Sequence, residues 1–209
     1  MTILLICISL PLLMYLVAEF NIKENFTKWF KVPVSTGKIG LEVATHLLEK
    51  YELKHIKIAI TDGQLTDHYD SENRRIALSK EVYYGNSVAA IAVLAHEIGH
   101  ALQDKANYTL YSYTMKLKPL AVLFGSITPI TLIFGLLVWP WLIGITIFAI
   151  ILVILVQILV LLVEWDASKR AKEILLENGL VKRQELIGVN QTLTAAGFTY
   201  VAAIFRWNY

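Results

Sequence analysis

Long apolar runs alternate with polar segments along this chain. One run covers residues 3–17, and a longer one covers residues 119–163 without any Asp, Glu, Lys or Arg. A helix needs about 20 residues to cross a bilayer core about 30 Å thick, so the longer run suits two crossings. A Trp-Pro-Trp sequence at 139–141 is typical of a turn at a membrane interface. The pattern predicts a transmembrane helical hairpin, with helices at about 119–138 and 142–163.

The apolar stretches near the two ends of the chain each allow two interpretations. The run at 3–17 is short for a span, so it fits either an uncleaved anchor or a cleaved signal peptide. We favour an anchor over about residues 1–20, because no Lys or Arg precedes the run and residues 14–16 are a poor cleavage context. The stretch at about 186–204 contains Asn, Gln, Thr and Gly among its apolar residues. It fits either a last span or a helix packed on the polar part.

The polar segment that precedes the hairpin predicts a small sheet followed by a buried helix. Its periodicities and turn residues predict, in order, a helix at 41–51, a strand at 56–60, a turn at 61–63, a turn at 69–73 and a strand at 75–79. Residues 88–102 are mostly apolar and helix-forming, with Asn86 or Ser87 as the N-cap. A helix this apolar must be buried among other elements.

Composition agrees with a membrane protein. Hydrophobic residues make up 56% of the chain and charged residues 17%, whereas soluble domains carry roughly 25% charged residues. The net charge of the chain, +2, is small, and the lysines and arginines are scattered along the sequence, so no nucleic-acid partner is expected. The single cysteine, Cys7, excludes an internal disulfide and a multi-cysteine metal site.

Basic residues indicate how the chain crosses the membrane. They follow the first apolar run and flank both ends of the hairpin, whereas the turn at 139–141 carries no charge. Basic flanks favour the cytoplasmic side of a membrane. The polar segments at about 21–118 and 164–190 are therefore predicted to face each other on that side, in a multi-pass protein of the cell membrane.

The candidate chemistry lies on the predicted apolar helix, where residues 96–100 read H-E-x-x-H. Residues four apart share one helical face, so His96 and His100 can bind one zinc ion. Glu97 lies beside that face, where its carboxylate can act as general base on water activated by the metal. Chance is the competing explanation, as are two structural histidines, but a charged Glu97 on a buried helix would then need a partner. Gly99 costs about 1 kcal/mol relative to Ala in mid-helix, which predicts that a strand or the substrate packs closely there.

A catalytic zinc site also requires a third protein ligand and one open position. His46, His55 and His68 are candidates from the upstream segment, on a predicted helix, a strand edge and a turn. Glu164 is a stronger candidate, because it is the first charged residue after the long apolar run. The predicted hairpin returns it to the side of the H-E-x-x-H helix. Either Asp166 or Ser168, on the same predicted helix, can hydrogen-bond a ligating histidine and fix its tautomer.

Four segments together resemble the bacterial YugP-type family of membrane neutral zinc metallopeptidases. They are residues 63–70 (GQLTDHYD), 94–101 (LAHEIGHA), 163–168 (VEWDAS) and 199–203 (TYVAA), in the expected order. The resemblance spans nearly the whole chain. More distantly, the sequence is similar to gluzincin peptidases of the HtpX and CAAX-protease type, which carry a later Glu ligand in a Glu-x-x-Ala-Asp setting. Ser168 replaces that aspartate here, and Asp166 is its nearest substitute.

The resemblance implies a mainly α-helical membrane protein whose zincin-like α+β core combines a small sheet, the H-E-x-x-H helix and the hairpin in one domain over residues 1–209. It implies one Zn²⁺ per chain, held by His96, His100 and Glu164, with Glu97 as general base. Residues 65–70, which include His68, would lie near the cleft as an edge strand that pairs with substrate backbone. Tyr200 is expected either to stabilise the oxyanion or to be an ordinary packed aromatic.

The leading hypothesis is a membrane-bound zinc-dependent endopeptidase that acts on peptides or membrane proteins at the lipid bilayer. An alternative reaction for the same site is hydrolysis of a non-peptide amide. The alternative is a non-catalytic membrane scaffold or chaperone-like relic with a vestigial metal site, but such a protein would gain nothing from keeping Glu97. A transporter is disfavoured, because the predicted spans lack buried charges and paired broken helices. The sequence predicts neither the substrate nor the oligomeric state.

Overall fold

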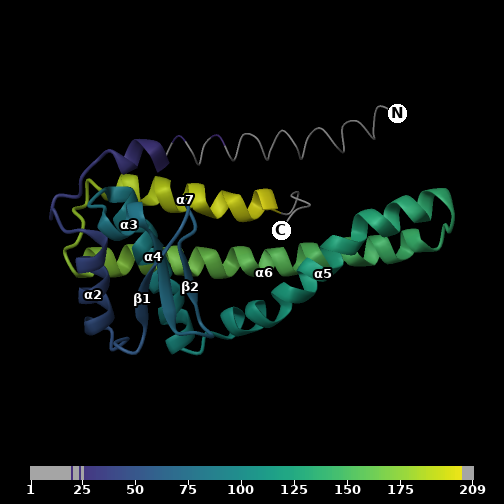
Figure 1. Ribbon diagram of the computed structural model, residues 1–209, viewed down its shortest axis with the longest axis horizontal. Helices are drawn as coiled ribbons and strands as arrows, with labels where there is room; N and C mark the ends of the chain where they lie inside the picture. The colour runs from purple at the N-terminus through teal and green to yellow at the C-terminus, as the bar shows by residue number, and fades with distance from the viewer. Residues whose placement is uncertain (1–19, 21–23, 25, 204–209) are drawn as a thin grey trace. The chain divides into compact units, whose positions relative to one another are not determined.

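The structure is a computed structural model that describes residues 20, 24 and 26–203. The predicted anchor at 1–20 lies outside these residues, except for its last position. The described chain is mostly helical with a small sheet, as the sequence predicts. Its elements are α2 (Gly40–Lys50), β1 (Lys57–Thr61), β2 (His68–Asp70), β3 (Arg75–Ser79), α3 (Lys80–Tyr84), α4 (Val88–Lys105), α5 (Thr109–Leu137), α6 (Leu142–Glu177) and α7 (Leu186–Ala203) (Figure 1).

The chain divides into two compact units. The polar unit contains Phe20–Tyr108 and Glu164–Gly197, and the described part of the hairpin unit contains Thr109–Val163 and residues 198–203. The boundary at Val163 lies inside the continuous helix α6, which runs on to Glu177. The sequence predicted a membrane span to 163 with Glu164, Asp166 and Ser168 on the same helix beyond it, and α6 contains all three residues. Our view of residues 1–209 as one domain stays a prediction.

The sheet of the polar unit has three strands in the order β1-β3-β2. β1 pairs parallel with β3, and β2 pairs antiparallel with it, so β2 is an outer strand. The predicted strands at 56–60 and 75–79 are both present, the first shifted by one residue. The turn predicted at 69–73 is wrong at its start, because Tyr69 lies in β2 opposite Ile76 and its side chain is buried. The turn begins after Asp70, whose carboxylate accepts a hydrogen bond from the Asn73 backbone at 3.0 Å.

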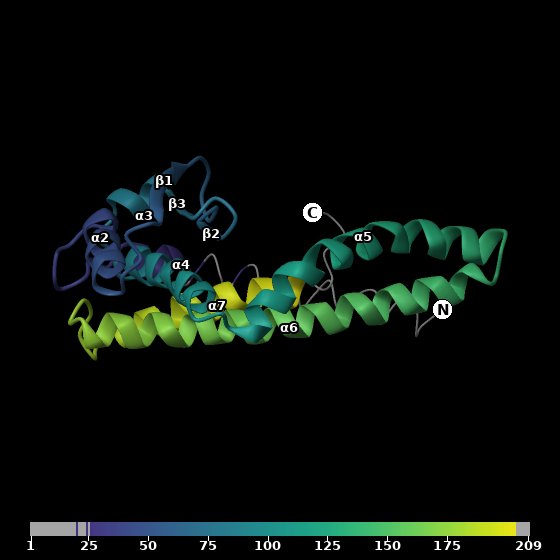
Figure 2. The same cartoon turned by 90° about the horizontal axis from the view of Figure 1, so that it is seen from below.

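Helix α4 forms the centre of the polar unit. It begins as expected at the N-cap Ser87, whose hydroxyl accepts a hydrogen bond from the Ala90 backbone amide at 3.1 Å. Its side chains are almost all buried, and Ile91, Leu94 and Ile98 are fully so. The helix packs against β2, β3, α2 and α3. Figure 2 shows α4 lying between the sheet and the part of α6 that belongs to this unit.

Gly99 is a point of close approach between α4 and α6. A Cβ atom at Gly99 would lie 2.6 Å from the backbone carbonyl oxygen of Ala167, a distance that no real Cβ contact tolerates. The expectation that something packs closely against Gly99 is confirmed, but the neighbour is the α6 backbone rather than a strand or the substrate. The contact matters for the candidate site, because Glu164 stands one helical turn before Ala167 and is thereby held beside α4.

The described part of the hairpin unit consists of α5 and the first part of α6, joined by a short turn near Trp139. The two helices are linked by the Thr146 hydroxyl, which donates to that of Thr131 at 2.8 Å. The rings of Phe124 and Phe148 also pack at 6.1 Å. Helix α5 begins ten residues before the predicted start at 119. The prediction began with the uncharged run, but the preceding residues, which include two lysines, are also helical.

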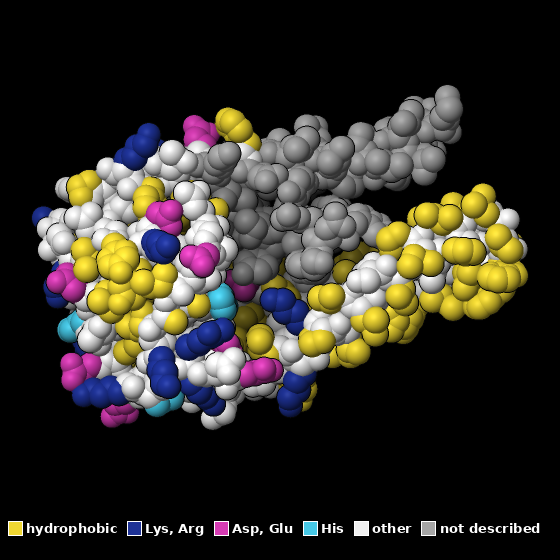
Figure 3. Space-filling view, viewed as in Figure 1, with side chains coloured by type: hydrophobic (Ala, Val, Ile, Leu, Met, Phe, Trp, Pro, Cys, Tyr) yellow, Lys and Arg dark blue, Asp and Glu magenta, His cyan; other side chains and the backbone are white. Residues whose placement is uncertain are grey.

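Helices α5 and α6 are the two described helices that are long and apolar enough to cross a membrane. Only 17% and 28% of their most apolar windows are buried, whereas a soluble core helix would be mostly buried. In the view of Figure 3, hydrophobic side chains cover most of the described hairpin surface, and charged side chains gather on the polar unit. Helix α7 forms where either a span or a packed helix was expected, and whether it crosses the membrane stays a prediction.

Candidate metal centre

Two histidines stand one turn apart on α4. His96 and His100 present their rings on the same face, with ring centroids 4.7 Å apart and planes nearly perpendicular at 84°. His96 is buried and His100 is nearly so. Four-residue spacing on a helix produces this arrangement directly, because 3.6 residues make one turn.

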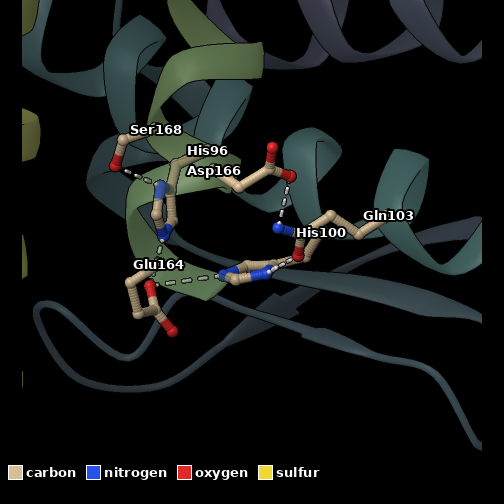
Figure 4. Close-up of polar contacts among 6 residues, drawn as sticks. All are labelled: His96, His100, Gln103, Glu164, Asp166 and Ser168. Atoms are coloured by element: carbon tan, nitrogen blue, oxygen red, sulfur yellow. Dashed lines mark hydrogen bonds and ion pairs between the residues drawn. The ribbon is translucent and has the colours of Figure 1, made fainter. Parts of the chain in front are cut away.

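Glu164 reaches the same point from α6 (Figure 4). Its Oε2 atom lies 2.9 Å from His96 Nε2 and 3.5 Å from His100 Nε2. One potential ligand atom from each of the three residues falls within 4.8 Å of the others. Four ligands at about 2.1 Å from a tetrahedral zinc ion lie roughly 3.4 Å from one another. The donor set and its spacing therefore fit a zinc ion.

Glu97 is a buried carboxylate beside the two histidines. It is 6% exposed. Burial raises its pKa, because removal from water disfavours the charged form, while His96 and His100 act in the opposite direction. A carboxylate whose pKa lies above its ordinary value is better able to hold a proton between two steps of a reaction.

The negative charge of Glu164 contributes to a raised pKa of His100. Burial by itself would lower the pKa of His100, but the Glu164 carboxylate, with the charge of Glu97 and the hydrogen bond to Gln103, outweighs burial and raises it to about 9. A raised pKa favours the form of His100 in which both ring nitrogens carry hydrogen. A metal ion that binds this histidine must compete with the second proton.

Each histidine also has a partner at its other ring nitrogen. The Ser168 hydroxyl lies 3.2 Å from His96 Nδ1, and the Gln103 side-chain oxygen lies 3.0 Å from His100 Nδ1. Of the two residues expected to contact a ligating histidine, Ser168 does so directly, at His96. Asp166 instead accepts a hydrogen bond from the Gln103 amide at 2.9 Å, so one side chain stands between it and His100.

Gln103 was not among the candidates that the sequence suggested. It is fully buried, and it lies three residues after His100 on the same helix. That spacing places it on the face of the helix that carries the histidines. The sequence offered only the spacing from His100 as a signal, because Gln103 lies just beyond the predicted helix of 88–102.

The other predicted residues lie apart from this group or cannot be placed. Among the described residues, the cluster with metal-ligand spacing contains none of the upstream histidines. His46, His55 and His68 are all exposed. His68 lies on β2 with its Nδ1 atom 2.8 Å from the Thr66 carbonyl oxygen. Tyr200 lies in α7, but its side chain falls outside the described part, so its role stays a prediction.

The chain is similar to known proteins over most of its length. It is 39% identical over 187 residues to the Bacillus subtilis (strain 168) protein named "Putative membrane protease YugP". The aligned region covers 89% of this chain and 83% of that protein. No solved structure matches the chain. Residues 2–206 match the family described as "Putative neutral zinc metallopeptidase", and the chain belongs to that family.

Proposed function

We propose that this protein is a membrane-bound zinc-dependent endopeptidase. The observation that carries the proposal is the convergence of His96, His100 and Glu164 around one point, with the buried Glu97 next to them on the same helix. Membership of a family described as zinc metallopeptidases supports it, as does a relative named as a membrane protease.

Each residue of the centre has a distinct role in this proposal. His96, His100 and Glu164 hold the metal, and bound zinc supplies a Lewis acid that polarises the scissile carbonyl and lowers the pKa of water. Glu97 takes the proton from the attacking water and returns it to the leaving amine. The exclusion of solvent around Glu97 strengthens its interactions with nearby charges.

The sheet offers a place for the substrate backbone. β2 is the outer strand of the sheet on the side opposite β1, and it packs against α4. An outer strand has backbone groups that can pair with an extended peptide, which then lies along the strand. We place the scissile peptide beside β2, in the segment where the sequence resemblance implied an edge strand.

The setting proposed for this reaction is the membrane surface. Helices α5 and α6 are long and apolar enough for two crossings, and the basic flanks favour the cytoplasmic side for the polar unit. The substrates that fit this setting are peptides or membrane proteins presented at the bilayer. The bond that we propose is cleaved is a peptide bond in the interior of the substrate chain.

Zinc removal tests the proposal. The full chain, purified in detergent and treated with a chelator, should lose cleavage of casein at least about 100-fold, because the Lewis acid is gone. Addition of about one zinc ion per chain should restore it. Casein cleavage and zinc content are measured on the same samples. Cleavage that persists after zinc has fallen below detection would show that the activity does not use this centre.

A further inference from the structure

A chain of polar side chains, buried at Gln103 and half-buried at Asp166 and Arg170, leads away from His100. The Gln103 side-chain oxygen lies 3.0 Å from His100 Nδ1, and its amide nitrogen donates to Asp166 Oδ2 at 2.9 Å. The same Asp166 oxygen accepts a hydrogen bond from Arg170 Nε at 2.6 Å. Figure 4 shows Gln103 standing between His100 and Asp166. The guanidinium of Arg170 in turn lies over the Tyr108 ring, 5.7 Å from its centroid.

The direction of these hydrogen bonds follows from the chemistry of their members. An ionised carboxylate only accepts, so Asp166 must face the NH₂ group of Gln103 rather than its oxygen. Arg170 is consistent with this direction, because its guanidinium can only donate and it bonds the same Asp166 oxygen, which is therefore an acceptor. The Gln103 oxygen is then left facing His100. Since that oxygen also only accepts, His100 Nδ1 must carry the hydrogen.

The two histidines differ in whether the partner at Nδ1 determines which ring nitrogen carries the hydrogen. Ser168 lies 3.2 Å from His96 Nδ1, and a hydroxyl can either donate or accept. Ser168 therefore does not decide where the proton of His96 sits. The partner of His100 does decide, because Asp166 accepts from the NH₂ group of the Gln103 amide and leaves only the acceptor oxygen facing His100.

We propose that Gln103 is a positioning residue that holds His100 with its Nδ1–H on the Gln103 oxygen and its Nε2 turned toward Glu164. The consequence for zinc rests on the proposed function, since Nε2 is the atom that would bind the metal. The hydrogen bond itself does not depend on metal. Arg170 and Asp166 fix the orientation of the Gln103 amide and act on His100 through it.

Three variants of the full chain test this inference. Gln103→Met keeps the length of the side chain but removes both its acceptor and its donor. The double variant Q103E/D166N is made together with Arg170→Met, because Arg170 would otherwise donate toward the new amide NH₂ group. The combined variant, Q103E/D166N/R170M, exchanges the carboxylate and the amide, so an acceptor still faces His100 and a donor still faces the new carboxylate. Leu94→Met changes a fully buried residue on the same helix that has no polar role, and it controls for altered packing.

Two measurements are made on each variant in detergent micelles. The first is the Nδ1–H proton resonance of His100 in ¹⁵N-histidine-labelled protein without zinc. The second is the zinc dissociation constant by competition with a chelator. We expect Q103M to lose the protected resonance and to bind zinc about 10- to 100-fold more weakly. Q103E/D166N/R170M should keep both properties within about threefold of the original chain, and L94M should change neither.

The outcomes separate this inference from the proposed function. If Q103M keeps the protected resonance, or if Q103E/D166N/R170M behaves like Q103M, Gln103 does not position His100. If the resonances follow the expectation while the original chain binds no zinc, the hydrogen bond stands and the proposed function fails. If Q103M binds zinc as tightly as the original chain and loses only the resonance, positioning has no effect on the metal and the inference is overturned.

Discussion

Replacing Glu97 with glutamine should abolish peptide cleavage while the zinc content stays the same. Glutamine has nearly the same shape but cannot take up the proton of the attacking water, and loss of a general base costs about 100- to 10,000-fold in rate. Glu97 is not among the three residues whose ligand atoms converge, so zinc should remain. The values to compare are kcat/KM for a fluorogenic peptide and zinc per chain by elemental analysis.

The control for this variant is Glu173→Gln, which removes an exposed carboxylate from α6. It should cleave at the rate of the original chain. Unchanged activity in E97Q would rule out Glu97 as the base. Zinc in both proteins without cleavage of any peptide would instead favour the non-catalytic scaffold or chaperone-like relic.

Removing the Glu164 side chain should weaken zinc binding by at least about 100-fold, because the centre loses one of three protein ligands. In the Glu164→Ala variant, His96 Nε2 and His100 Nε2 also lose the carboxylate that lies 2.9 Å and 3.5 Å away. The zinc dissociation constant is measured by chelator competition at a fixed pH, since ligand protonation competes with the metal.

Glu173→Ala serves as the matched control, because it truncates a glutamate on the same helix at an exposed position. Its zinc affinity should equal that of the original chain. If E164A bound zinc equally well, the third ligand would lie elsewhere. His68, the exposed histidine of β2, would then be the next residue to replace.

The parts of the site that depend on local periodicity could be predicted from the sequence. His96 and His100 share a face because they are four residues apart on a helix, and Ser87 begins that helix where a serine N-cap was expected. Glu164 could be suggested because an uncharged run long enough for two crossings ends immediately before it. The sequence could not show that Glu164 comes within hydrogen-bonding distance of the histidines, because that depends on packing between distant segments.

The features that the sequence did not reveal depend on tertiary contacts. Gly99 could be recognised as a site of close approach, but only the structure shows that the neighbour is the backbone of Ala167. Tyr69 stands among turn-forming residues, yet pairing with β3 draws it into a strand. Gln103 carries no motif, and its importance appears only once Asp166 and His100 are seen on either side of it.

The most direct test is to locate zinc in the E97Q protein by anomalous X-ray scattering from crystals of the full chain. We expect one zinc peak about 2.0–2.1 Å from a nitrogen of each of His96 and His100, and about 2.0–2.2 Å from a Glu164 oxygen. A zinc peak held by the two histidines with Glu164 beyond bonding distance, or a peak at another place in the chain, would contradict it.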